Sequence, residues 1–278
     1  MASVPASEFA PGRPPVQHRE CRHAGKPPTP VFIGSLARGL RVLRSFSAER
    51  PEMTLTQVAD CTNLTRAGAR RFLLTLVELG YVRKDVRLFR LTPKVLELGL
   101  AYLCSTPLSR LSQPCLKQFT ELTGESCSIA VLDGDEVVFI ARTLSRRFLR
   151  PGMHVGMRMP ACYTAAGRML VAGGGEAAID RYLETADLQP RTRHAIDSKV
   201  VLRAELLRVM QQGFAIVDQE LEEGLCSLSV ALRDHSRQVI AAINTASHVA
   251  AVPRNEMLRR FLPLLRAVAA DIEDALAT

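Results

Sequence analysis

Arginine side chains are concentrated at the start of a predicted helix, in the segment TRAGARRFLLTLVELGYV over residues 65–82. Thr65 can cap the start of this helix, and Gly80 stands where a helix commonly ends in the left-handed conformation. Apolar side chains recur at three- and four-residue spacings and so share one face, namely Ala69, Phe72, Leu73, Leu76 and Leu79. The pattern predicts a helix over about residues 66–79 with one buried face and one basic face.

The basic face has two interpretations. Arg66, Ala67, Arg70 and Arg71 point away from the apolar face. Guanidinium groups bind phosphate oxygens and the edges of guanine bases. A charge run is also what an ordinary solvated helix face looks like. The distribution of charge along the chain and the neighbouring elements decide between the two.

The net charge of +8 comes entirely from the first hundred residues. Residues 1–100 contain 16 Lys and Arg against 8 Asp and Glu, whereas residues 101–278 contain 20 of each. Contacts to phosphates supply most of the non-specific affinity for DNA, so this division indicates a DNA-binding domain joined to a domain with a different task. A membrane-surface segment fits less well, because the arginines are spread over several short elements.

Short elements flank the arginine-rich helix on both sides. Residues 35–47 form a predicted helix that places Leu36, Leu40, Leu43 and Phe46 on one face. An extended piece and a short helix over residues 56–61 follow, and after Gly80 the apolar alternation predicts a hairpin. Helix, helix, turn, helix and hairpin in this order predict a winged helix-turn-helix over residues 32–92.

In such a unit the helix after the turn enters the major groove by its N-terminal end. We therefore predict that Arg66 and Arg70 reach base edges and that Arg71 contacts phosphates. Thr65 and Ala67 belong to the same predicted DNA surface. Lys84 and Arg87, at the hairpin tip, are expected over an adjacent groove or the backbone.

The remaining composition is that of a globular protein. A chain of 278 residues, 47% hydrophobic and 23% charged, can fill one large or two ordinary cores. No run reaches the roughly 18 apolar residues of a membrane span, and the chain does not open on a signal-peptide pattern, so we expect a cytoplasmic protein. The seven cysteines lie singly and the histidines lack metal-ligand spacing, so we expect no metal and no cofactor. Seven prolines within residues 1–31 predict a disordered tail.

The second half of the chain mixes helix and strand patterns. Residues 93–107 form a predicted linker whose apolar helix also suits a dimer contact, and residues 108–278 form an α+β domain with a hairpin turn at Asp133-Gly134-Asp135. An acidic cluster over residues 218–223 lies on a loop, where carboxylates more often cap a helix or bind water than perform acid–base catalysis. No nucleophile, base and orienting group come together, so we expect no enzyme.

Six segments resemble the IclR family of bacterial transcription regulators: SLARGLRVL, LTQVADCTNLTRAGARRFLLTLVELGYV, FRLTPKVLELG, MPACYTAAGRMLVAG, GFAIVDQELEEGLCSLSVALRD and QVIAAINTAS. The resemblance extends over residues 33–276 and implies a winged helix-turn-helix followed by a GAF-like effector-binding domain. The segments TRAGARRF, PACYT and AGR are similar in particular to the branch that controls protocatechuate, 4-hydroxybenzoate and beta-ketoadipate catabolism.

The resemblance also implies an effector cavity lined by Ala165, Ala166, Asp218, Ser227, Ser229, Asn244 and Ala246. A cavity of this kind needs apolar walls with a few polar groups that fix the ligand. Tyr163 and Thr164 can supply a phenol and a hydroxyl. Arg142, which ends a predicted strand, is a candidate partner for a carboxylate, although a surface ion pair would explain it equally well.

Two classes of function follow. The first is a DNA-binding activator of aromatic-acid catabolism genes, controlled by a small aromatic carboxylate and acting as a homodimer or a dimer of dimers. The alternatives are an IclR-type repressor that responds to a small keto acid, and a sensor or enzyme domain that carries a winged helix without binding DNA.

Overall fold

The computed structural model describes residues 31–145 and 153–277. The chain divides into two compact units between Leu98 and Gly99, inside the predicted linker. No helix among the described residues is both long enough and apolar enough to cross a membrane.

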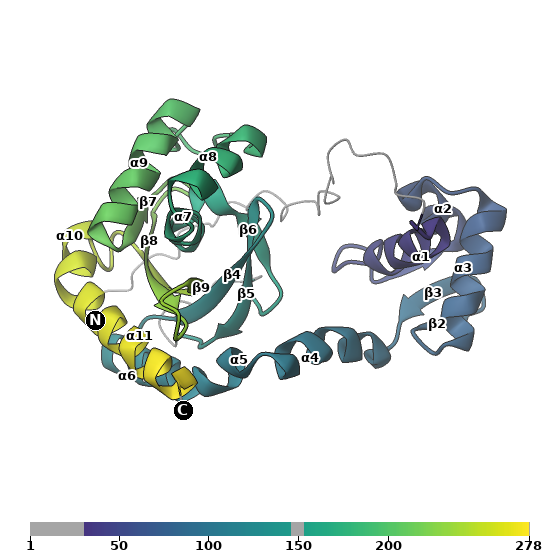
Figure 1. Cartoon of the computed structure of the whole chain (residues 1–278). Coiled ribbons are helices and arrows are strands. Elements are labelled where there is room, and N and C mark those ends of the chain that lie inside the picture. The colour runs from purple at the N-terminus through teal and green to yellow at the C-terminus, as the bar shows by residue number, and fades with distance from the viewer. Residues whose placement is uncertain (1–30, 146–152, 278) are drawn as a thin grey trace, which may run out of the picture. The chain divides into compact units, whose positions relative to one another are not determined.

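The first unit is a winged helix-turn-helix, as predicted (Figure 1). Its strands form an antiparallel sheet in the order β1-β3-β2. Its elements are α1 (Gly34–Arg44), β1 (Glu52–Thr54), α2 (Leu55–Thr62), α3 (Arg66–Glu78), β2 (Val82–Asp85) and β3 (Leu88–Leu91).

Local capping chemistry fixes the turn between α2 and α3. Asn63 ends α2 in the left-handed conformation, with φ 52°. The Thr65 hydroxyl then accepts the Gly68 N–H at 3.1 Å and begins α3, which confirms the predicted cap. At the other end Gly80 has φ 82°, also as predicted. The orientation of α3 relative to α2 therefore rests on a few capping residues.

The predicted apolar face of the first helix is only partly buried. Val42 and Phe46 lie in the core with Ala69, Leu73, Leu76 and Phe89, and Leu43 packs at its edge. Leu36 and Leu40, in contrast, are 61% and 48% exposed. The core of this small unit covers only the C-terminal part of α1. The apolar pattern of residues 35–47 therefore predicts more buried side chains than α1 contributes.

The linker begins with a short 3-10 turn (η1, Pro93–Val95) followed by α4 (Leu96–Ser105). The Lys94 ammonium donates to the Leu79 carbonyl at 3.0 Å and lies over the Tyr81 ring. This contact satisfies a carbonyl at the end of α3, where a cation is also favourable for the helix dipole. No residue of α4 is buried.

The second unit is built around a six-stranded antiparallel sheet in the order β6-β5-β4-β9-β8-β7, which confirms the α+β prediction (Figure 1). The strands are β4 (Cys127–Asp133), β5 (Glu136–Arg142), β6 (Arg158–Pro160), β7 (Ala215–Asp218), β8 (Leu225–Arg233) and β9 (Val239–His248). The helices are α5 (Pro107–Leu111), α6 (Gln113–Thr123), η2 (Ala161–Tyr163), α7 (Ala165–Gly173), α8 (Glu176–Thr185), α9 (Lys199–Gln212), α10 (Arg254–Glu256), the π-helical turn η3 (Met257–Phe261) and α11 (Leu262–Ala277).

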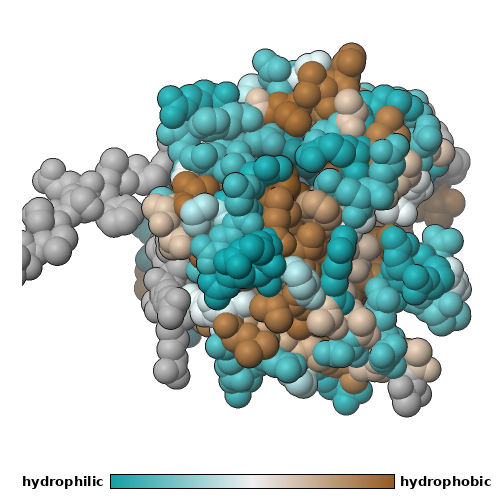
Figure 2. Space-filling view, turned by 90° about the vertical axis from the view of Figure 1, so that its left-hand side faces the viewer, coloured by the Kyte–Doolittle hydropathy of each residue, from teal (hydrophilic) through white to brown (hydrophobic). Residues whose placement is uncertain are grey.

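Helices cover both faces of this sheet. On one face, which we call the α11 face, Leu228, Val230 and Ile243 pack against α5, α6 and α11. On the other, the α7 face, Ala130, Val217 and Ala242 pack with α7 and α9. On the side of the unit shown in Figure 2, hydrophobic residues reach the surface only in patches between hydrophilic ones. Because successive residues of a strand point to opposite faces, only every second residue of a strand can contact a ligand on a given face.

Candidate DNA-binding surface and effector site

The basic face of α3 is exposed, as predicted. Ala69, Leu73 and Leu76 hold the opposite face in the core. Arg66, Ala67, Arg70 and Arg71 are all exposed, and the three arginines form no ion pair with any residue that the structure describes. Thr65 stands at the N-terminus of α3 as its cap. These charges are therefore available to a phosphate or a base.

The wing presents two further free cations. Lys84 lies in β2 and Arg87 in the two-residue turn before β3; both are exposed and neither is ion-paired within the described parts of the chain. Asp85, between them, is instead held by Arg90 at 2.9 Å. The acidic residue of the wing is thus neutralised inside the sheet, while the two cations are left for an external anion.

The strand register places several predicted effector residues in one row on the α7 face. Arg142 lies opposite Ser128, Ser128 opposite Asn244, Asn244 opposite Ser229, and Ser229 opposite Ala215. Ser227 and Ala246 pair with each other two residues along. The row brings together side chains from β5, β4, β9 and β8. Ser128 escaped the sequence analysis, although its alternation with Ala130 could have indicated it.

Two members of this row carry polar atoms without partners. The Nε and Nη1 atoms of Arg142 are buried and have no hydrogen-bond partner among the described residues, and burial lowers the pKa of this guanidinium. The Asn244 side chain is 8% exposed and makes no hydrogen bond within the same residues. The Ser229 hydroxyl is satisfied by the Ile243 carbonyl at 2.8 Å. Buried polar atoms are rarely left unsatisfied, so the Arg142 end of the row suits an anionic ligand.

The predicted segment at the start of α7 is buried throughout. Ala165 and Ala166 are fully buried, and the Thr164 hydroxyl caps α7 by accepting the Gly167 N–H at 3.1 Å. The Tyr163 hydroxyl is buried without a hydrogen-bond partner among the described residues. Burial raises the pKa of Tyr163 to about 12, so the side chain is a neutral phenol at physiological pH.

Asp218 does not join the other predicted effector residues. It lies opposite Cys226, whose side chain belongs to the core on the α11 face. The Asp218 carboxylate also contributes, after burial, to raising the pKa of the Cys226 thiol. Because Val217 points to the α7 face, the next residue must point to the other one. The period of two could have revealed this from the sequence.

Glu220, from the predicted acidic cluster, is buried rather than solvated. Its carboxylate accepts two hydrogen bonds from Arg168, at 2.8 and 2.6 Å. Sequence analysis missed this pair, because its partners lie 52 positions apart in the chain and leave no local signal.

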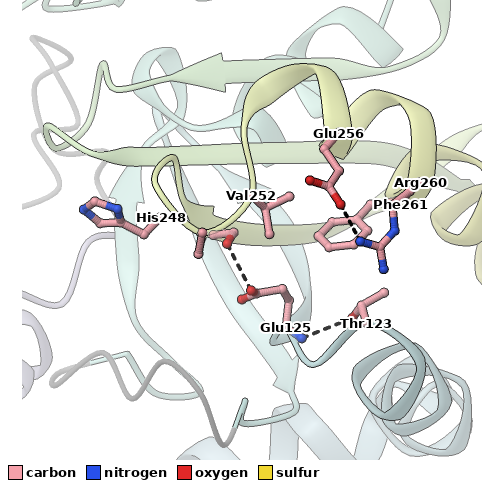
Figure 3. A pocket seen from close by; sticks show the side chains of 9 residues that line it. Thr123, Glu125, His248, Val252, Glu256, Arg260 and Phe261 are labelled. Atoms are coloured by element: carbon pink, nitrogen blue, oxygen red, sulfur yellow. Dashed lines mark hydrogen bonds and ion pairs between the residues drawn. The ribbon is translucent and has the colours of Figure 1, made fainter. Parts of the chain in front are cut away.

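A pocket of about 180 Å³ lies elsewhere in the second unit, between the ends of α6 and β9 and the π-helical turn (Figure 3). Glu125 accepts the Ser247 hydroxyl at 3.0 Å, and Glu256 pairs with Arg260. The odd-numbered residues in the C-terminal part of β9 face α11, and Ser247 is one of them. This pocket therefore lies on the opposite side of the sheet from the row of Arg142, Ser128, Asn244 and Ser229, which we call the polar row. None of the predicted effector residues lines it.

Known proteins resemble the chain over nearly all of its described length. A family model described as the IclR helix-turn-helix domain matches residues 35–86, and one described as the bacterial transcriptional regulator IclR C-terminal domain matches residues 100–274. The Pca regulon regulatory protein of Pseudomonas putida is 42% identical, over 87% of this chain and 84% of its own length. The p-hydroxybenzoate hydroxylase transcriptional activator of Acinetobacter baylyi is 33% identical, over 88% and 93%.

Among solved structures, an IclR homologue from Microbacterium hydrocarbonoxydans in complex with 4-hydroxybenzoate has the same fold, with a TM-score of 0.77. It is 23% identical, and the match covers 87% of this chain and 98% of that one. The helix-turn-helix, the free arginines of α3 and the two matching family models agree. The chain belongs to the IclR family of bacterial transcriptional regulators.

Proposed function

We propose that this regulator activates genes of aromatic-acid catabolism and that a small aromatic carboxylate controls it through the α7 face of the sheet. The observation that carries the proposal is the half-buried Arg142 side chain, whose buried Nε and Nη1 atoms lack partners among the described residues, at the end of the polar row. By their names, one relative regulates a Pca regulon and the other is a transcriptional activator for p-hydroxybenzoate hydroxylase. As a regulator of bacterial genes, the protein would work in the cytoplasm.

The proposed ligand matches the chemistry of the row. A carboxylate can accept both free N–H groups of Arg142 in a charge-assisted pair. A ring hydroxyl can bond to the Asn244 amide or the Tyr163 phenol, which are both buried. Small side chains such as Ala165, Ala166 and Ala246 leave flat apolar walls for a ring. A small keto acid would use Arg142 but would leave the more distant polar groups unpaired.

Calorimetric titration of the full chain tests this proposal. We expect 4-hydroxybenzoate and protocatechuate to bind, and glyoxylate and pyruvate to bind at least tenfold more weakly, since they satisfy fewer buried groups. The same acids should change a gel shift on the promoter of a regulated gene. Binding of the keto acids alone would favour the repressor alternative, and a gel shift that is insensitive to salt would argue against phosphate-driven DNA binding.

We also propose that α4 pairs with α4 of a second copy in a homodimer. Four large side chains on this helix are exposed, namely Leu96 (67%), Leu98 (50%), Leu100 (53%) and Tyr102 (49%). Apolar side chains in such number on one short helix commonly mark a protein interface. A second copy is the natural occupant, since a dimer presents two α3 helices to two half-sites on DNA.

Sedimentation equilibrium tests the role of α4. Leu96 and Leu100 stand four residues apart, on one side of α4. Replacing both by Glu should raise the dimer dissociation constant by at least roughly a hundredfold, because each buried leucine contributes about 1.5–3 kcal/mol. Leu122→Glu, on α6 and 60% exposed, is the matched control and should leave the mass unchanged. An undiminished dimer in the α4 variant would place the interface elsewhere, and a mass of four chains would indicate a dimer of dimers.

A further inference from the structure

A buried ion pair joins α7 to the turn after β7. Arg168 is 2% exposed and Glu220 is 7% exposed. Their contact is bidentate, with Nη1 donating to Oε1 at 2.8 Å and Nη2 donating to Oε2 at 2.6 Å. Two charges at this depth are held by mutual hydrogen bonds rather than by water.

The pair connects three segments that lie far apart in sequence. The Arg168 Nε donates to the Cys162 carbonyl at 2.8 Å and so fixes the η2 turn. The Ile196 N–H donates to Glu220 Oε2 at 3.0 Å, which holds the connection between α8 and α9. Close beside it, the Thr192 hydroxyl donates to the Gln219 carbonyl at 2.7 Å. A single carboxylate therefore accepts hydrogen bonds from α7 and from the α8–α9 connection.

Tyr163 is joined to this arrangement through the backbone. It directly follows Cys162, whose carbonyl Arg168 holds, and the charges of both Arg168 and Glu220 act on its phenol. Its hydroxyl is buried and lacks a partner among the described residues. The backbone that carries Tyr163 is also packed tightly, since a Cβ on Gly167 would lie 2.3 Å from the Ala161 backbone. The position of the hydroxyl therefore depends on the backbone of this turn.

Stability alone does not account for such a pair. Apolar side chains of similar volume commonly stabilise a fold as well as a buried ion pair does, because desolvating two charges is costly. What the apolar substitutes cannot do is hold the Cys162 carbonyl and the Ile196 N–H in fixed directions. The benefit of the charges is thus geometric, and the Cys162 carbonyl that Arg168 holds belongs to the peptide bond that leads into Tyr163.

We infer that Arg168 and Glu220 are positioning residues of the effector site, which hold Tyr163 and the start of α7 in the arrangement that binds the ligand. This inference rests on the proposed function, because it assumes that the α7 face receives an aromatic carboxylate. It adds two residues that contribute through Tyr163 rather than by touching the ligand. It also makes the α8–α9 connection sensitive to the same contact.

The test compares the full chain with the variant R168M/E220L, which replaces the ion pair by apolar side chains. We expect thermal unfolding at a somewhat lower temperature, because the Cys162 carbonyl and the Ile196 N–H lose their partners, and a dissociation constant for 4-hydroxybenzoate at least tenfold higher, measured by calorimetric titration on the folded variant. Tyr163→Phe should weaken binding in the wild type but add little in the double variant, because the hydroxyl is already misplaced there. The control R203A/D180A removes an exposed ion pair between α9 and α8 and should leave the affinity unchanged.

The possible results are separable. If the wild type binds neither 4-hydroxybenzoate nor protocatechuate, the proposed ligand class is wrong, and this inference is wrong as well because it depends on that class. If the wild type binds and R168M/E220L binds equally well, only the inference is wrong. Fully additive losses from R168M/E220L and Tyr163→Phe would also overturn it, since the pair would then act independently of the phenol. Should R168M/E220L fail to fold, Glu220→Gln replaces it, because glutamine keeps the shape of the side chain and removes its charge. The inference is then tested by the same titration, with and without Tyr163→Phe.

Discussion

Arg142→Met is expected to weaken binding of 4-hydroxybenzoate to the full chain by about 2–5 kcal/mol, roughly 30- to 4,000-fold. The substitution removes the cation whose Nε and Nη1 are buried and unpartnered within the described residues. It leaves the ligand carboxylate buried without a counter-charge. Because an unpaired guanidinium is costly to bury, the ligand-free variant should unfold at a temperature no lower than that of the wild type. Calorimetric titration and thermal unfolding of the same samples measure both effects.

Arg158→Met is the matched control for this experiment. Arg158 lies on β6, and its guanidinium is already satisfied by Glu136 and Asp133, each at 2.7 Å. We expect an affinity for 4-hydroxybenzoate equal to that of the wild type. Unchanged affinity in Arg142→Met would show that the effector binds elsewhere, with the pocket between Glu125 and Arg260 as the next candidate.

Arg70→Ala is expected to lower the affinity for a selected operator by about 1–3 kcal/mol, the range of a bidentate contact to a base. Binding to random DNA should fall much less. The physical reason is that Arg70 is exposed on α3, one turn beyond the N-terminal cap, and forms no ion pair with the described residues. Fluorescence anisotropy on a selected operator and on a scrambled duplex, at several salt concentrations, measures the specific and the non-specific affinity.

Arg71→Ala provides the comparison. As a predicted phosphate contact, it should weaken both duplexes alike and reduce the slope of log affinity against log salt by about one. Arg208→Ala, which removes an exposed partner of Glu205 on α9, is the control that should change neither. Equal losses on operator and scrambled DNA in Arg70→Ala would make Arg70 a phosphate contact as well.

Elements whose signals are local could be predicted from the sequence. Thr65, Gly80 and the arginines of α3 lie within one short segment, and caps, apolar period and turn residues act between neighbours along the chain. The hairpin turn at Gly134 was also predicted from a local signal, because glycine readily adopts the positive φ that such a turn requires. In the structure Gly134 has φ 66°. The order of these elements was enough to predict a winged helix-turn-helix and an α+β domain.

The sequence by itself thus determined most secondary elements and the division of charge, and it supplied the residues that we predict to bind DNA. Only the tertiary structure decided which residues of different strands lie opposite one another and which distant side chains meet. Strand register aligned Arg142 and Asn244 in one row through Ser128. Packing left Leu36 exposed and buried Glu220 against Arg168. The physical reason is that burial and long-range pairing depend on contacts between segments far apart in sequence, which no local periodicity encodes.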